Sequence, residues 1–142
     1  MHNNQYVIFE LNGQQYGVEI GYIQEITRFN DFEDVLVIPN KKEDIEGVIN
    51  IRGDIIPILN LKKKFELKDK EIHKNAQVII FKKDEQFIGL IVDNASQVLQ
   101  IKKEHTEPLS DLVISSSEKS HCKEIIKINN KLIFILDIAH FI

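Results

Sequence analysis

The sequence predicts an all-β protein in which one small β unit occurs twice. Three observations lead to this prediction: short apolar runs rich in isoleucine, valine and phenylalanine, turn-forming residues between the runs, and a weak repeat of the whole pattern. The repeat predicts two five-stranded barrels in one chain. Because a unit of about 70 residues has little interior, we expect the two barrels to pack along a shared apolar seam.

The first repeated block is a strand, a turn and a second strand. The stretch "VIFELNGQQYGVEI" (7–20) aligns with "IIFKKDEQFIGLIV" (79–92) at an offset of 72 residues, and Gly17 then faces Gly89. Alternating apolar residues on both sides of a polar turn are typical of a hairpin. We therefore predict the same hairpin at both places.

The second repeated block is also a hairpin. The stretch "GVINIRGDIIPILNL" (47–61) aligns with "EIIKINNKLIFILDI" (124–138) at an offset of 77 residues. Here Gly53 faces Asn130, and both residue types tolerate a positive φ, so the turn is a structural requirement met twice. We expect residues 1–142 to form one domain whose halves, roughly 7–70 and 71–142, do not fold independently, with Ile51 on the seam.

The segments between the matched blocks do not align. Residues 30–47 and 102–124 are rich in charge, serine, asparagine and proline, which predicts loops with one helical turn each. The segment 92–105 has an apolar spacing that suits a strand or a short helix, and we favour the strand.

Composition and charge narrow the class of protein. The 142 residues carry 18 basic and 22 acidic side chains, for a net charge of -4, and no basic block that would neutralise phosphates, which argues against nucleic acid as a partner. The first residues do not resemble a signal peptide, and no apolar run approaches the roughly 18 residues of a membrane span. The single cysteine, Cys122, cannot form an internal disulfide, so we expect a cytoplasmic protein.

No catalytic or metal-binding motif stands out. The five histidines are scattered and match no metal-ligand spacing: His2, His73, His105, His121 and His140. The sequence has no glycine-rich phosphate loop, and the serines at 115–117 lack the "GxSxG" context of a nucleophile. We therefore expect a protein without enzymatic activity, metal or cofactor.

Comparison of the two copies identifies candidate binding residues. A residue that both copies share is most simply explained by the fold, whereas a residue peculiar to one copy needs another explanation. Three residues are peculiar to the first copy: Arg52, Gly47 and Glu25, which face Asn129, Glu124 and Gln97. Arg52 is either a solvated charge on the hairpin or a recognition residue. The missing side chain of Gly47 leaves room for another backbone to approach.

The stretch "GVINIRGDIIPILNL" closely resembles the signature of the CheW family, the adaptor proteins of bacterial chemotaxis arrays. The resemblance extends through "YVIFELNGQQYGVEIGYIQEI", "VIPNKKEDIEGVINIRG", "VIIFKKDEQFIGLIVDNASQVLQI" and "LIFILDI", which together cover nearly the whole chain. It implies two intertwined SH3-like five-stranded β-barrels around a shared hydrophobic core. It also implies an adaptor that couples transmembrane chemoreceptors to the histidine kinase CheA, whose regulatory domain has the same fold.

The resemblance implies specific site residues and partners. Arg52, Gly53 and Gly47, together with Ile23 and Glu25, would form the surface that faces the cytoplasmic tips of methyl-accepting chemoreceptors. The regulatory domain of CheA would bind elsewhere, at residues that the resemblance does not name. We expect a stand-alone adaptor that is a monomer when isolated and joins membrane receptor arrays through its partners.

The chain also departs from the family pattern. Asn60 and Lys62 stand where the family usually has an acidic residue and an arginine, and Lys42 replaces a usual proline. Whether these changes alter partner specificity is left open at this point. The competing interpretation is a double-barrel module outside chemotaxis that binds a peptide or another ligand.

Overall fold

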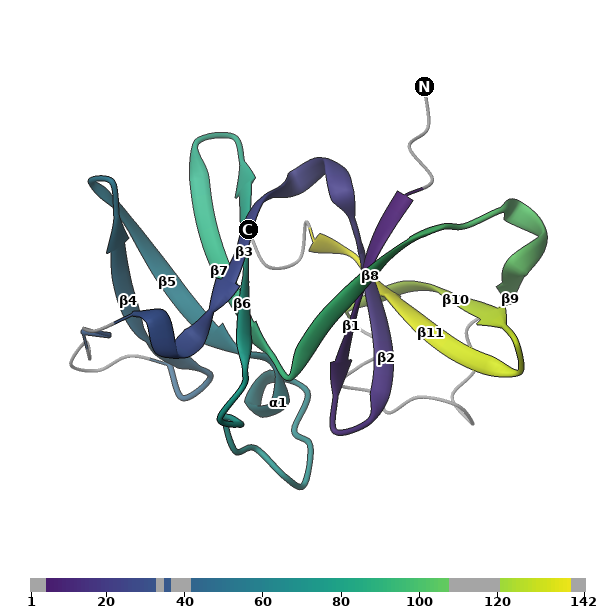
Figure 1. Cartoon of the computed structure of the whole chain (residues 1–142), viewed down its shortest axis with the longest axis horizontal. Helices are drawn as coiled ribbons and strands as arrows, with labels where there is room; N and C mark the ends of the chain where they lie inside the picture. The colour runs from purple at the N-terminus through teal and green to yellow at the C-terminus, as the bar shows by residue number, and fades with distance from the viewer. Residues whose placement is uncertain (1–4, 33–34, 37–41, 108–120, 139–142) are drawn as a thin grey trace.

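Strands dominate the architecture of the chain. The computed structural model describes residues 5–32, 35–36, 42–107 and 121–138 (Figure 1). The strands are β1 (Gln5–Leu11), β2 (Gln14–Glu19), β3 (Ile23–Arg28), β4 (Ile45–Ile51), β5 (Asp54–Asn60), β6 (Gln77–Lys83), β7 (Gln86–Val92), β8 (Asn94–Gln100), β9 (Thr106–Glu107), β10 (Cys122–Ile128) and β11 (Lys131–Leu136). A short α-helix, α1 (Leu61–Lys64), follows β5, and three 3₁₀ turns are η1 (Ile20–Tyr22), η2 (Phe29–Asp31) and η3 (Lys103–His105).

The strands form two SH3-like barrels that lie side by side (Figure 1). The first barrel has the strand order β3-β6-β7-β5-β4, and the second has the order β8-β1-β2-β11-β10-β9. The second sheet has six strands rather than the five expected, because the two-residue strand β9 pairs with β10. The predicted all-β fold of two small barrels is confirmed.

The two barrels exchange strands between the two copies of the repeat. The first copy gives β1 and β2 to the second barrel and β3, β4 and β5 to the first, whereas the second copy gives β6 and β7 to the first barrel and the rest to the second. One copy of the repeat is therefore not one barrel. The word "intertwined" describes this exchange, because each barrel needs strands from both halves of the chain.

Strand registers confirm the repeat position by position. Gly17 lies opposite Ile135 in the parallel pair β2–β11, and Gly89 lies opposite Ile58 in the parallel pair β7–β5. A Cβ atom at Gly17 would lie 2.8 Å from the Cδ1 atom of Ile135, and one at Gly89 would lie 2.6 Å from the Cδ1 atom of Ile58. The two glycines are shared because each leaves space for an isoleucine of the neighbouring strand.

The core is continuous between the barrels. The main cluster of buried apolar side chains takes members from both sheets, among them Val7, Phe9, Tyr16, Phe81, Leu90 and Phe134. Each barrel also has a smaller cluster of its own. The expected place of Ile51 was wrong: this side chain is half-buried at the end of β4 and packs against the cluster of the first barrel alone.

A buried polar corner connects the barrels beside α1. The side-chain oxygen of Asn60 accepts hydrogen bonds from the backbone N–H groups of Lys62 and Lys63 and so begins the helix. The Lys62 Nζ atom lies 2.7 Å from an oxygen of Asp93, whose other oxygen accepts from the backbone N–H of Asn12. Both departures from the family pattern are buried, so an effect on a partner would have to act through the fold.

The connecting segments agree with the expectations where they are described. Residues 94–100 form a strand, as favoured, and η2 and η3 are single turns in or beside the predicted loops. Residues 33–34, 37–41 and 108–120 of these loops lie outside the described residues. Lys42 accepts a hydrogen bond from the backbone N–H of Ile45 through its carbonyl oxygen. In the part of the chain that the structure describes, no helix is long and apolar enough to cross a membrane.

Candidate functional site

Arg52 and Glu25 meet on the surface of the first barrel. The Arg52 Nη2 atom lies 2.7 Å from the Glu25 Oε1 atom, so the β4–β5 turn is joined to β3. The Arg52 side chain is 77% exposed and that of Glu25 is 35% exposed. The two charged residues that are peculiar to the first copy therefore form one unit, although 27 residues separate them in the sequence.

The turn holds Arg52 in an unusual backbone conformation. The φ angles of Arg52 and Gly53 are +49° and +87°, and the equivalent Asn129 and Asn130 have +53° and +61°. Positive φ at both central positions is what a type I′ hairpin turn requires, and asparagine and glycine adopt it most easily. An arginine in this region is uncommon and costs about 1 kcal/mol or more in backbone strain. The position therefore favours Asn, and the arginine needs a reason outside the fold.

Gly53 serves the turn. Its backbone N–H donates a hydrogen bond to the side-chain oxygen of Asn50 at 3.0 Å, which closes the hairpin from within. The sequence reasoning did not single out Asn50, although an asparagine three residues before a turn glycine is a recognisable turn signal.

Ile23 lies on β3, two residues before Glu25. A bulge separates the two in their pairing with β6, where Ile23 faces Phe81 and Glu25 faces Ile80. The Ile23 side chain is half-buried and packs against the shared core. It supports the strand that presents Glu25 and exposes only part of its own surface.

Gly47 lies below the surface. A Cβ atom at this position would lie 2.4 Å from the carbonyl oxygen of Leu36 and 2.8 Å from the Cγ1 atom of Val35. The expected backbone approach occurs, but the approaching segment belongs to this chain: Leu36 exchanges two backbone hydrogen bonds with Val48, at 3.0 and 2.9 Å. Gly47 therefore allows a short segment to cover the edge of β4, and Leu36 itself is 60% exposed.

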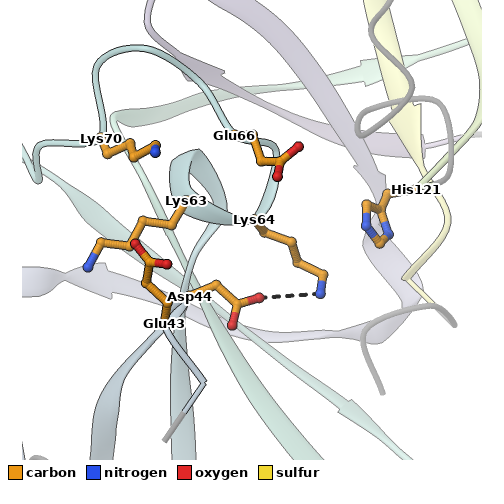
Figure 2. Close-up of a pocket in the computed structure, with 7 residues that line it drawn as sticks. All are labelled: Glu43, Asp44, Lys63, Lys64, Glu66, Lys70 and His121. Carbon is orange, nitrogen blue, oxygen red and sulfur yellow. Dashed lines mark hydrogen bonds and ion pairs between the residues drawn. The ribbon is translucent and has the colours of Figure 1, made fainter.

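A separate polar pocket of about 270 Å³ lies beside α1 (Figure 2). Its side chains are Glu43, Asp44, Lys63, Lys64, Glu66, Lys70 and His121. Two of its lysines are engaged in ion pairs, Lys64 with Asp44 at 3.4 Å and Lys63 with Glu46 at 2.9 Å. Acidic and basic groups alternate around the pocket, so it does not present a field of one sign to a ligand. Among the residues that the structure describes, no group of three or more His, Cys, Asp and Glu side chains could hold a metal ion.

Tyr6 lies at a charged junction on the second barrel. Burial, followed by the charges of Glu124 and Glu19, raises the pKa of Tyr6 from 10.0 to about 12. Its hydroxyl group donates a long hydrogen bond of 3.5 Å to Glu124, and Lys123 pairs with Glu19 next to it. These groups hold strands together and are remote in the fold from the β4–β5 turn, which belongs to the other barrel.

Comparison with protein families matches residues 5–142 to the CheW-like domain. The chain belongs to the CheW-like family. It is 32% identical to the chemotaxis protein CheW of Klebsiella aerogenes over 111 residues, which are 78% of this chain and 65% of that protein. It is 28% identical to the chemotaxis protein CheW of Bacillus subtilis over 131 residues, which are 92% of this chain and 81% of that protein.

A solved structure has the same fold. The crystal structure of the scaffolding protein TtCheW from Thermoanaerobacter tengcongensis superposes with a TM-score of 0.82 at 30% sequence identity, covering 96% of this chain and 86% of that one. The expected membership of the CheW family is thus confirmed, and with it the class of function: the chain is an adaptor, or scaffold, of chemotaxis.

Proposed function

We propose that the chain couples chemoreceptors to the histidine kinase CheA and binds each partner through a different surface. The receptor's cytoplasmic tip would bind at the Arg52–Glu25 pair, and the kinase's regulatory domain would bind elsewhere. The adaptor itself would catalyse no reaction. It would reside in the cytoplasm and reach membrane receptor arrays through its partners.

The exposed Arg52–Glu25 pair is the observation that supports the receptor site most strongly. It occurs in one of the two copies only, so the barrel fold does not require it, and it occupies a turn that would be less strained with asparagine. A residue that costs stability and lies on the surface is a candidate for recognition rather than for folding.

The geometry suits a helical hairpin tip as a partner. Glu25 takes one edge of the Arg52 guanidinium, and the side chain is 77% exposed, so its remaining N–H donors can reach carboxylates or main-chain carbonyl groups of a partner. Glu25 would orient the planar group before the partner arrives, which reduces the entropy lost on binding.

The other residues of the proposed site would contribute less directly. Gly53 shapes the turn, and Ile23 supports the strand that carries Glu25. Gly47 is buried, so its contribution would be to let Leu36 and its neighbour cover the edge of β4 and thereby fix the exposed surface there.

Arg52→Asp tests the receptor site. Because surface substitutions usually change stability little, we expect a nearly unchanged melting temperature. Receptor binding, measured by titration calorimetry with soluble receptor tips, should weaken at least about tenfold, since one charge-assisted contact is typically worth about 1.5–3 kcal/mol.

Arg52→Asn is the matched control, because it places the second copy's residue in the same turn. We expect it to keep or raise the melting temperature while it loses receptor affinity. If both variants bound receptor as the native chain does, the proposed receptor site would be wrong. Binding to the kinase regulatory domain should survive in both variants.

A further inference from the structure

A groove of about 440 Å³ opens between β5 and β7 of the first barrel, away from the polar pocket. Its walls are the apolar side chains of Ile55, Pro57, Phe87 and Ile88, and its rim carries the carboxylates of Asp54 and Glu85. The two hairpin turns of this barrel flank it, one before β5 and one before β7 (Figure 1).

The groove is apolar inside and negative at its rim. Ile55 is 59% exposed, which is unusual for an isoleucine next to a phenylalanine and a proline. The Glu85 carboxylate is 91% exposed and has one cation nearby, Lys82, at 3.9 Å. The same Lys82 Nζ atom lies 5.3 Å from the centre of the Phe87 ring, so that lysine is already engaged.

The second barrel shows that the fold does not require this surface. At the position of Ile55 the second copy has Leu132, which is half-buried and packs against the shared core. At the position of Asp54 it has Lys131, and at that of Glu85 the first copy has Gly13. The second barrel thus has neither the exposed isoleucine nor the two carboxylates at the equivalent places.

Backbone strain points to the same end of the first barrel. Asp84 and Glu85 form the β6–β7 turn with φ angles of +48° and +67°, whereas the equivalent turn of the second barrel is Asn12–Gly13, with +51° and +86°. Glutamate adopts this conformation at a cost that glycine avoids. The fold would be better served by glycine or asparagine at position 85, so the carboxylate has a use outside the turn.

We propose that this groove is a docking site for a protein segment that presents an aromatic or aliphatic side chain next to lysine or arginine. The apolar side chain enters between Ile55 and Phe87, and the flanking cation pairs with Asp54 or Glu85 at the rim. An anchor in an apolar pocket with charges at its edge is the usual anatomy of such contacts. Charge complementarity at the rim selects basic segments against acidic ones.

The test uses the full chain, labelled with ¹⁵N, and the blocked pentapeptide Gly-Lys-Phe-Lys-Gly as probe. We expect saturable shifts of the amide resonances of Ile55 and Phe87. The matched peptides Gly-Glu-Phe-Glu-Gly and Gly-Lys-Ala-Lys-Gly should each bind at least about fivefold more weakly, which corresponds to about 1 kcal/mol for the lost rim pair or anchor.

Variants separate a docking site from a sticky surface. Ile55→Ser should weaken peptide binding at least about fivefold, and Val98→Ser, an aliphatic residue that is 51% exposed on the other barrel, should leave binding unchanged. Glu85→Asn should raise the melting temperature and weaken binding together. Equal binding of the acidic peptide, unchanged binding by Ile55→Ser, or a lower melting temperature of Glu85→Asn would each overturn the proposal. The probe contains neither receptor nor kinase, so the result does not depend on the proposed function.

Discussion

Asn60 shows how one side chain fixes a junction. Its oxygen begins α1, and its Nδ2 group donates to the carboxylate of Glu46 at 3.1 Å and to the carbonyl oxygen of Lys70 at 3.2 Å. An aspartate could begin the helix equally well but could not donate these two hydrogen bonds when ionised. The departure from the family's acidic residue is therefore matched to Glu46.

We predict that Asn60→Asp destabilises the chain. The side chain is 2% exposed, and the new carboxylate would face that of Glu46, so the free energy of unfolding should fall by about 1–3 kcal/mol. Urea denaturation measures this. Adding Glu46→Gln should recover part of the loss, because the amide can donate to the new aspartate; no recovery would show that the charge of Glu46 is not the cause.

Tyr6 predicts a loss of stability at high pH. Its folded pKa of about 12 lies above the unfolded value of 10.0, so the folded chain keeps the hydroxyl proton over a range in which the unfolded chain loses it. Stability from this group is complete below pH 10 and falls between pH 10 and 12, by up to about 2–3 kcal/mol. In the same interval the Tyr6→Phe variant should lose less stability than the native chain. Parallel losses in the two proteins would refute this assignment.

The candidate site illustrates what single residues reveal. The turn chemistry of Gly53 and Asn130 could be predicted because it is local. The pairing of Arg52 with Glu25 could not, because 27 residues separate them and their approach depends on how β3 and the β4–β5 hairpin close the barrel. The comparison of copies found both residues, and the resemblance to the CheW family put them in one site.

At the scale of elements, the two copies are more alike than their sequences. Leu36 pairs with Val48 on β4, and Glu107 pairs with Ile125 at the equivalent position on β10. The sequence analysis treated both segments as loops that do not align. They match in backbone hydrogen bonds alone, which place no demand on side chains and so leave no pattern in the sequence.

Gly47 controls the first of these pairings. We predict that Gly47→Ala displaces the Leu36 segment, because the new Cβ atom would lie 2.4 Å from a backbone oxygen that cannot rotate away. The backbone amides of Leu36 and Val48 should exchange hydrogen faster in the variant. Gly21→Ala is the control, since nothing lies within 4 Å of its Cβ position. Unchanged protection in Gly47→Ala would mean that the edge of β4 tolerates the methyl group.

The exchange of strands between barrels also belongs to the element scale. The offsets of 72 and 77 residues predicted which segments are alike, and the structure confirms those matches. An offset does not state which copies pair, because like strands offer the same pattern of apolar side chains to either partner. Only the closed sheets show that β3 pairs with β6 and β1 with β8.

For the whole molecule, the exchange bears on independent folding. Four strand pairs join the two halves: β1–β8, β2–β11, β3–β6 and β5–β7. We predict that residues 1–70 and residues 71–142, expressed separately, show no cooperative thermal transition. An equimolar mixture should regain one, because the shared core can form only from both halves. A cooperative transition of residues 1–70 alone, followed by circular dichroism, would contradict the prediction.

The central claim is that one molecule holds receptor and kinase at separate surfaces. The most direct measurement is co-sedimentation of the kinase with receptor-bearing membranes in the presence of the native chain or of Arg52→Asp, after the kinase affinity of both proteins has been measured in solution. The native chain should carry the kinase into the pellet. Arg52→Asp should bind the kinase equally well in solution and yet leave it in the supernatant. Equal sedimentation of the kinase with both proteins would contradict the account.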